Sequence, residues 1–250
     1  MSTENKFIQR FSDKAENYHQ YRPGYPHAAI DQILKDLPIN SQFIAADIGA
    51  GTGISANLLA QKGIQVIAVE PNAKMRVIAQ PHPLVKYVDG HADKLNFADN
   101  SIDLITSFQA FHWFPPEASL REFARVLKSS GRLALVWNDL DTNHLFSGEY
   151  YKIIRTVADN STPEQLWTAI APLTTSSLFT NLQLYIFPNI KKYNQESLTG
   201  LVKSISWFPS DVNIQQQIFS QLLNLISQHS DEDGFVELHH CTRVYTANLA

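Results

Sequence analysis

The chain has 250 residues, of which 44% are hydrophobic and 11% aromatic, enough to build the core of one large α/β domain. Its net charge of -4 argues against a nucleic-acid partner, which would usually need a basic face. A single cysteine, Cys241, excludes an internal disulfide. Neither a signal peptide nor an apolar run long enough for a membrane span is visible. We expect a soluble cytoplasmic protein, and its oligomeric state is left open.

Apolar runs alternate with helical patterns through the first 138 residues. Five short apolar runs predict strands at 43–48, 64–69, 84–88, 102–106 and 132–137. Helices are expected at 7–18, 26–37, 54–62, 73–80 and 116–127, with Gly63 and Gly131 as caps of the third and fifth. This alternation implies parallel strands joined by right-handed crossovers.

The remaining residues are less regular. Helices are expected at 148–159, 197–205 and 214–228, whereas 162–178 gives no clear pattern. Alternating residues predict strands at 182–188 and 235–247. His239 and Cys241 share one face of the last strand, but two ligands do not make a metal site and no second pair is spaced to help. We therefore expect no bound metal.

The most informative stretch is the glycine-rich segment from Asp47 to Gly53, which directly follows the first apolar run. Three glycines at alternate positions let the backbone turn sharply and approach a ligand that a Cβ would push away. The next apolar run ends in Glu70, whose carboxylate can accept hydrogen bonds from both hydroxyls of a ribose. The spacing therefore predicts an adenosine-like cofactor.

The glycine pattern differs from the two common phosphate-binding loops. A dinucleotide-binding loop reads Gly-x-Gly-x-x-Gly, and here the third glycine comes one residue earlier, at Gly53. No Gly-Lys-Ser/Thr follows, which excludes a P-loop. A plain tight turn in an α/β protein is the structural alternative.

The segment from Asp47 to Gly53 resembles motif I of class I S-adenosylmethionine-dependent methyltransferases. Glu70-Pro71-Asn72, followed by Met75, looks like the ribose-binding end of the second strand in that family. The segment 90–95 resembles its adenine-flanking loop, and 107–114 resembles a signature of the methyltransferase type 11 group. The motif at 18–26 is similar to trans-aconitate-methyltransferase-like proteins. The resemblance covers residues 7–138 well.

The resemblance implies an α/β fold with a Rossmann-like, doubly wound, seven-stranded sheet, mostly parallel with an antiparallel last strand. It implies one methyltransferase domain with an N-terminal helical cap at 1–40, a cofactor-binding core at 41–138 and acceptor-side elements at 139–250. Its cofactor would be S-adenosyl-L-methionine. The positions implied to bind it are Tyr18, Arg22, Asp47, Gly49, Ala50, Gly51, Thr52, Gly53, Glu70, Pro71, Met75, His91, Ala92, Asp93, Gln109 and Ala110.

Several of these positions have alternative roles. Many relatives carry an acid where His91 stands, so His91, Asp93 or backbone groups could hold the adenine. Met75 could pack on adenine or fill the core. Arg22 could pair with the cofactor carboxylate or be held by local carbonyls, and Tyr18 has the same two readings. Asp47 would order the glycine loop or hold the cofactor's amino group.

His112 is the candidate catalytic residue, because it follows the fourth strand at the carboxyl end where open α/β sheets place their ligands. A histidine could act as a base near neutral pH, or His112 could shape the pocket wall. Trp113, Phe114 and Trp137 suggest an apolar acceptor pocket, although core positions would explain them equally.

Together these features predict methyl transfer to a small molecule, with a carboxylate or lipid-like acceptor favoured by the resemblance. A nicotinamide-dependent oxidoreductase and a non-catalytic S-adenosylmethionine-binding protein remain as alternatives. An RNA methyltransferase is disfavoured by the acidic balance and by the absence of an Asn-Pro-Pro-Tyr-type motif after the fourth strand.

Overall fold

A computed structural model describes residues 14–158 and 166–250 of the chain. The chain divides into two compact units. One, called here the helical unit, is made from the segments Met1–Pro23, Asp139–Glu164 and Pro188–Cys241. The other, the sheet unit, is made from Gly24–Asn138, Gln165–Phe187 and Thr242–Ala250. The sheet unit carries most of the predicted site.

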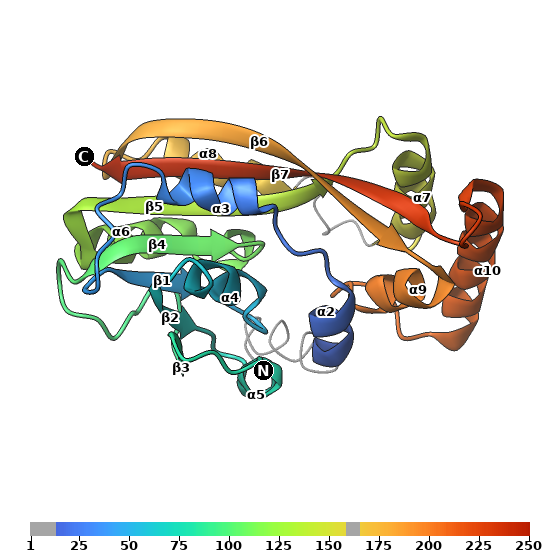
Figure 1. Cartoon of the computed structure of the whole chain (residues 1–250), viewed down its shortest axis with the longest axis horizontal. Helices are drawn as coiled ribbons and strands as arrows, with labels where there is room; N and C mark the ends of the chain where they lie inside the picture. Colours follow the sequence, from blue (N-terminus) through green and yellow to red (C-terminus); the bar gives the residue numbers. More distant parts are fainter. Residues whose placement is uncertain (1–13, 159–165) are drawn as a thin grey trace. The chain divides into compact units, whose positions relative to one another are not determined.

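Seven strands form one sheet in the order β3-β2-β1-β4-β5-β7-β6 (Figure 1). The strands are β1 (Ile44–Ile48), β2 (Gln65–Val69), β3 (Val85–Val88), β4 (Ile102–Phe108), β5 (Leu127–Leu140), β6 (Phe179–Tyr193) and β7 (Val236–Leu249). The pairs β1–β2, β1–β4, β2–β3 and β4–β5 are parallel. β7 runs antiparallel to β5, which confirms the predicted Rossmann-like sheet.

Helices cover both faces of the sheet unit. They are α3 (His27–Leu34), α4 (Ile54–Ala60), α5 (Ala73–Ile78), α6 (Pro116–Val126), α8 (Ala171–Thr174) and the 3-10 turns η1 (Phe111–Trp113) and η2 (Leu166–Ile170). Buried residues of α3 and α4 pack with one set of strand residues, and those of α6 and α8 pack with another. The central strands β1 and β4 are therefore buried on both faces, as parallel strands in α/β folds are.

The helical unit has its own core. Its helices are α2 (Ala15–Tyr21), α7 (Leu145–Arg155), α9 (Gln195–Lys203) and α10 (Val212–His229). Apolar side chains of α7, α9 and α10 form one buried cluster, centred on residues such as Tyr150, Leu198 and Leu222. An Asn194 capping box opens α9, and Asp211 caps α10. No helix of the described chain is both long and apolar enough to cross a membrane.

The predicted strands and helices are found in order, with one informative error. Gly131 was expected to cap α6, but that helix ends at Val126 and Gly131 lies inside β5. The register between β4 and β5 shifts here, because Ile102 pairs with Leu127 while Leu104 pairs with Arg132. A Cβ at Gly131 would lie 2.8 Å from the Lys128 carbonyl oxygen. The glycine is therefore explained by a β-bulge.

Other boundaries differ by a few residues. The helix expected at 7–18 lies mostly outside the described residues, and α2 begins at Ala15. β6 is longer than expected and continues through Pro188, which is tolerated because β6 is an edge strand. The unclear stretch at 162–178 contains η2 and α8, preceded by residues that are not described.

Candidate active site

The glycine loop between β1 and α4 has a left-handed backbone at all three glycines. At Gly49 (φ +72°) a Cβ would lie 2.6 Å from the Cβ of Ala110, so the loops after β1 and β4 touch there. At Gly53 (φ +82°) a Cβ would lie 1.8 Å from the Tyr87 hydroxyl. These two positions therefore require glycine for both conformation and space.

Most amide groups of this loop donate hydrogen bonds within the chain. The Gly49 and Ala50 amides both donate to the Val69 carbonyl, at 2.9 and 3.1 Å. The Gly51 amide donates to the Glu70 carboxylate at 2.9 Å, and the Gly53 amide donates to the Ala50 carbonyl at 2.9 Å. A loop that binds pyrophosphate presents such amides to the ligand instead.

Glu70 lies directly after β2 and is 8% exposed. One carboxylate oxygen accepts from the Gly51 amide and the other accepts from the Asn72 amide at 2.8 Å. Burial raises the pKa of Glu70, while these two backbone hydrogen bonds oppose the shift. A carboxylate has about four acceptor positions, so about two remain for ligand hydroxyls.

Asp47 lies at the end of β1 and is fully buried. Its carboxylate accepts from the Ser55 hydroxyl at 2.6 Å and from the Thr106 hydroxyl at 2.8 Å. Burial raises its pKa from 3.8 to about 6. Asp47 thus connects α4 and β4 next to the glycine loop, and whether it also holds the cofactor's amino group stays a prediction.

We predict that Asp47→Asn stabilises the protein at neutral pH. Asp47 binds its proton more tightly in the folded state than in the unfolded chain. The protonated Asp47 therefore contributes to the free energy of unfolding below about pH 4, and this contribution is lost as the pH rises through about 6. The shift of about two pKa units corresponds to about 3 kcal/mol. Urea unfolding at pH 4 and pH 7.5 should show a higher free energy of unfolding for the variant than for the wild type only at pH 7.5. A gain equal at both pH values would contradict this explanation.

The loop after β3 carries the predicted adenine residues. His91 and Asp93 are exposed, whereas Ala92 is 5% exposed and packs in the core beside Val69. His91 and Lys94 form an isolated bridge that folds this loop into a turn. Met75 of α5 is 3% exposed, so its side chain is buried.

The segment after β4 is held to β5 by Gln109. The Gln109 side chain donates to the Asn138 carbonyl at 3.1 Å and accepts from the Asn138 amide at 3.2 Å. Its backbone is left-handed, at φ +52°. Ala110 follows and packs against Gly49, so this turn and the glycine loop support each other.

His112 lies in η1, and its Nδ1 accepts a hydrogen bond from the Trp137 indole at 3.3 Å. Trp137 is fully buried, so its ring lies in the core and contacts Tyr245 edge-on. Phe114 also packs on the core, against Phe111 and Phe123. Trp113 is 38% exposed and is the one of the three aromatic acceptor candidates with a large exposed surface.

Tyr18 and Arg22 belong to the helical unit. Arg22 follows α2 and lies over the Tyr18 ring, 5.1 Å from its centroid. Its Nε donates to the Ser204 hydroxyl at 3.0 Å, and Nη2 donates to the Ser204 carbonyl at 3.3 Å. These contacts use the Arg22 guanidinium within the helical unit, and its role towards a cofactor carboxylate stays a prediction.

The chain is similar to known methyltransferases. The profile of the methyltransferase domain matches residues 46–135, which contain the glycine loop, Glu70 and His112. An uncharacterized methyltransferase of Schizosaccharomyces pombe is 30% identical over 198 residues, which make up 78% of each chain. The chain belongs to the methyltransferase family. An uncharacterized methyltransferase of Mycobacterium tuberculosis is 38% identical over 132 residues, 52% of this chain and 53% of that protein.

Solved structures share the fold of this methyltransferase. A protein of Anaeromyxobacter dehalogenans assigned to the type II methyltransferases has a TM-score of 0.68 at 20% identity, covering 92% of this chain and 98% of that one. A phosphoethanolamine N-methyltransferase of Haemonchus contortus, bound to S-adenosylhomocysteine, has a TM-score of 0.56 at 16% identity. That match covers 99% of this chain and 60% of the Haemonchus protein.

Three contributors to the methyltransferase site were missed by sequence reasoning. The Tyr87 hydroxyl fills the space at Gly53, and Arg76 donates to the Glu70 carbonyl and to Asp89. Asn138 donates to the Gly24 carbonyl and accepts from the Thr242 hydroxyl. Of the three, only Arg76 could have been suggested by the local sequence. It lies six residues after Glu70, late in the predicted helix 73–80, where a basic side chain is favourable.

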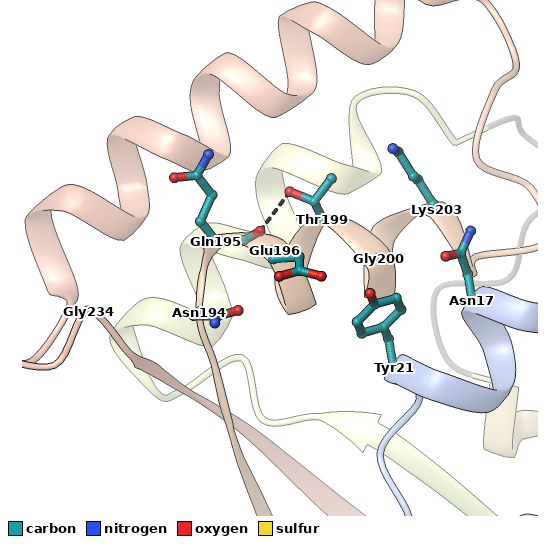
Figure 2. A pocket seen from close by; sticks show the side chains of 9 residues that line it. All are labelled: Asn17, Tyr21, Asn194, Gln195, Glu196, Thr199, Gly200, Lys203 and Gly234. Atoms are coloured by element: carbon teal, nitrogen blue, oxygen red, sulfur yellow. Dashed lines mark hydrogen bonds between the residues drawn. The ribbon is translucent and has the colours of Figure 1, made fainter.

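A separate cavity of about 630 Å³ lies in the helical unit (Figure 2). Its lining residues come from α2, α9 and the turn before β7: Asn17, Tyr21, Asn194, Gln195, Glu196, Thr199, Gly200, Lys203 and Gly234. None of the predicted cofactor or acceptor residues is among them. Across residues 14–158 and 166–250, no group of three or more His, Cys, Asp or Glu residues is arranged for a metal ion.

Proposed function

We propose that this methyltransferase transfers the methyl group of S-adenosyl-L-methionine to a small-molecule acceptor. The observation that carries this proposal is the chemistry of the glycine loop. Most of its amides donate hydrogen bonds within the chain, and two acidic side chains, Asp47 and Glu70, lie under and beside it. Such a site suits a nucleoside with a cationic sulfonium group better than it suits an anionic pyrophosphate.

The residues present fit S-adenosylmethionine. Glu70 retains acceptor positions for the ribose hydroxyls, and the left-handed glycine loop leaves no Cβ at Gly51 to obstruct a ligand. Thr52 adds a buried hydroxyl for which no partner exists in the described chain. Pro71, Met75, His91, Ala92 and Asp93 would surround the base, and Gln109 and Ala110 would support the loop, as the resemblance implies.

S-adenosylmethionine supplies an electrophilic methyl group whose transfer disperses the sulfonium charge. The protein's own task is to align the acceptor with that group and to exclude water. Trp113 offers exposed apolar surface beside His112, with ring centroids 4.8 Å apart. Trp137 and Phe114 would support these residues from the core.

The Trp137 hydrogen bond bears on the role of His112. Because Nδ1 accepts this bond, a neutral His112 ring carries its hydrogen on Nε2. In this tautomer His112 can donate a hydrogen bond to an acceptor molecule. To act as a base at Nε2, His112 would need the other neutral tautomer, with its hydrogen on Nδ1. That tautomer cannot accept the hydrogen bond from Trp137. We propose that His112 orients the acceptor.

We predict that His112→Ala lowers kcat and leaves the affinity for S-adenosylhomocysteine within about twofold. His112→Gln, whose amide can place a donor near the Nε2 position, should retain more activity than the alanine variant. Steady-state kinetics of the two variants check this. If His112 is a general base, both variants should lose about 10²- to 10⁴-fold in kcat. A native rate for His112→Ala would remove it from the site.

Transfer of labelled methyl from S-adenosylmethionine to a panel of small acceptors, including carboxylates and lipid-like compounds, tests the proposed reaction. The proposal predicts a labelled product whose rate of formation at limiting cofactor is lowered by Glu70→Ala. Tight binding of S-adenosylhomocysteine without transfer to any acceptor would favour the non-catalytic alternative.

A further inference from the structure

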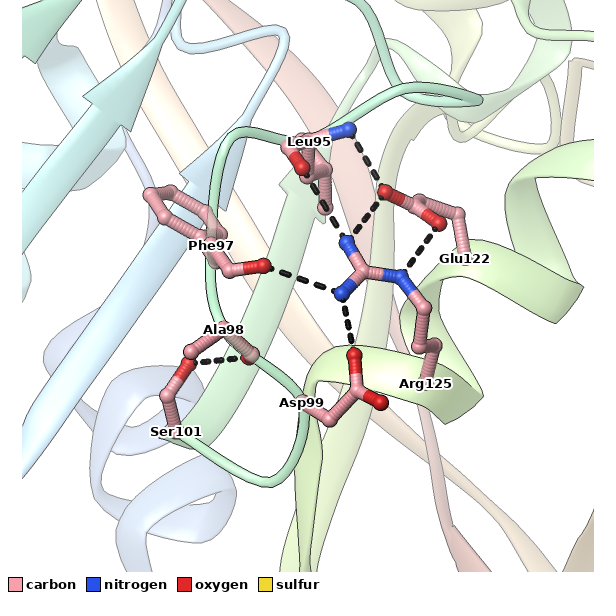
Figure 3. Close-up of polar contacts among 7 residues, drawn as sticks. All are labelled: Leu95, Phe97, Ala98, Asp99, Ser101, Glu122 and Arg125. Atoms are coloured by element: carbon pink, nitrogen blue, oxygen red, sulfur yellow. Dashed lines mark hydrogen bonds and ion pairs between the residues drawn. The ribbon is translucent and has the colours of Figure 1, made fainter.

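The segment 89–101, between β3 and β4, carries three of the positions expected around adenine and contains no helix or strand apart from the His91–Lys94 bridge. Local hydrogen bonds alone would leave such a segment many conformations. Its second half is instead attached to α6 through the side chains of Glu122 and Arg125 (Figure 3).

All five N–H donors of Arg125 are used. Nη2 donates to the Leu95 carbonyl at 3.1 Å, and Nη1 donates to the Phe97 carbonyl at 2.9 Å. Nη1 also pairs with the exposed Asp99, while Nε and Nη2 hold both oxygens of Glu122, at 2.9 and 2.7 Å. A single guanidinium thus joins three points of the segment to one helix.

Glu122 contributes a direct contact as well. Its carboxylate accepts from the Leu95 amide at 2.7 Å, so both polar backbone groups of Leu95 are bound by this pair. The Leu95 side chain is 5% exposed and lies in the same core cluster as Ala92. Fixing Leu95 therefore fixes the end of the short turn 91–94, which is only one residue away.

We propose that Arg125, oriented by Glu122, is a positioning residue that holds the adenine-side turn 91–94 in its binding conformation. This inference rests on the proposed function, because it assumes that the turn contacts the cofactor. It assigns no direct ligand contact to Arg125. Its effect reaches the ligand through the backbone of Leu95.

Arg125→Lys tests the inference, because a lysine keeps the charge but cannot reach Leu95, Phe97 and Glu122 in one plane. Arg132→Lys is a matched control: Arg132 of β5 also donates to two backbone carbonyls, those of Ile33 and Lys35, and neither belongs to the predicted site. Glu122→Gln is a second, milder variant that keeps an oxygen able to accept from the Leu95 amide.

The expected result has two parts. In the ligand-free protein, amide hydrogen exchange in residues 91–97 should be faster in Arg125→Lys than in Arg132→Lys. The Kd of S-adenosylhomocysteine should rise about tenfold in Arg125→Lys and less than twofold in the control, at comparable melting temperatures. The KM for S-adenosylmethionine should rise with kcat unchanged, and Glu122→Gln should have a smaller effect of the same kind.

Unchanged hydrogen exchange in 91–97 would overturn the inference. So would an increase in Kd that follows the loss of melting temperature equally in both arginine variants, which would mean that Arg125 acts on overall stability alone. If the wild type binds no S-adenosylhomocysteine, the proposed function fails and the positioning inference fails with it. If the wild type binds and Arg125→Lys binds equally well, only the inference fails.

Discussion

Glu70→Ala is expected to weaken S-adenosylhomocysteine binding by roughly 1–3 kcal/mol, or about 5- to 150-fold in Kd. The variant removes the proposed acceptor for the ribose hydroxyls. It also releases the Gly51 and Asn72 amides, so the glycine loop loses its connection to the end of β2. Isothermal calorimetry of the purified variant measures the effect.

Asp89→Asn is a suitable control for Glu70→Ala. Asp89 follows the neighbouring strand β3, its side chain is 71% exposed, and it pairs with Arg76 at the surface. A surface pair of this kind contributes little, so the control should bind with near-native affinity. Unchanged affinity in Glu70→Ala would remove Glu70 from the cofactor site.

Gly53→Ala is expected to destabilise the protein by about 2–5 kcal/mol. A left-handed backbone costs a residue with a Cβ roughly 1–2 kcal/mol. The overlap with the Tyr87 hydroxyl adds about 1–3 kcal/mol of overpacking. Urea unfolding of the variant gives the loss of unfolding free energy, and cofactor affinity should fall with it because the glycine loop must shift.

A second substitution separates the two causes. Tyr87→Phe removes a buried hydroxyl that has no partner in the described chain, so this change alone should be neutral or stabilising. In the double variant the new Cβ would face the ring carbon at 3.1 Å instead of the hydroxyl at 1.8 Å. The double variant Gly53→Ala/Tyr87→Phe should therefore recover the stability lost through overlap with the Tyr87 hydroxyl. It should not recover the stability lost through the left-handed backbone at residue 53. No recovery would show that the Tyr87 hydroxyl is not the obstacle.

The core of the fold could be predicted because its determinants are local. Short apolar runs followed by glycines and by Glu70 define the β1–α4–β2 unit between Ile44 and Val69. Gly131 misled the prediction because a glycine after a helix usually marks its cap. Here the helix ends earlier, and the glycine is required by the β4–β5 register shift, which depends on residues more than 20 positions away.

The site was only partly predictable for the same reason. The loop residues follow from motif and spacing, but their supports come from distant segments. Tyr87 lies against Gly53 from β3, Asn138 connects to Gly24 and Thr242, and Arg125 reaches back to Leu95. Only the fold brings these residues together. The bond from Trp137 to His112, which changes the chemical role open to the histidine, also links residues 25 positions apart.

The central claim is that the glycine loop and Glu70 bind S-adenosylmethionine and not a nicotinamide dinucleotide. Calorimetry of the wild-type protein with S-adenosylhomocysteine and, separately, with NADH tests it most directly. We expect about micromolar affinity for S-adenosylhomocysteine and no measurable binding of NADH. Binding of NADH alone would contradict the account. It would mean that the amides of the glycine loop exchange their hydrogen bonds within the chain for hydrogen bonds to a pyrophosphate.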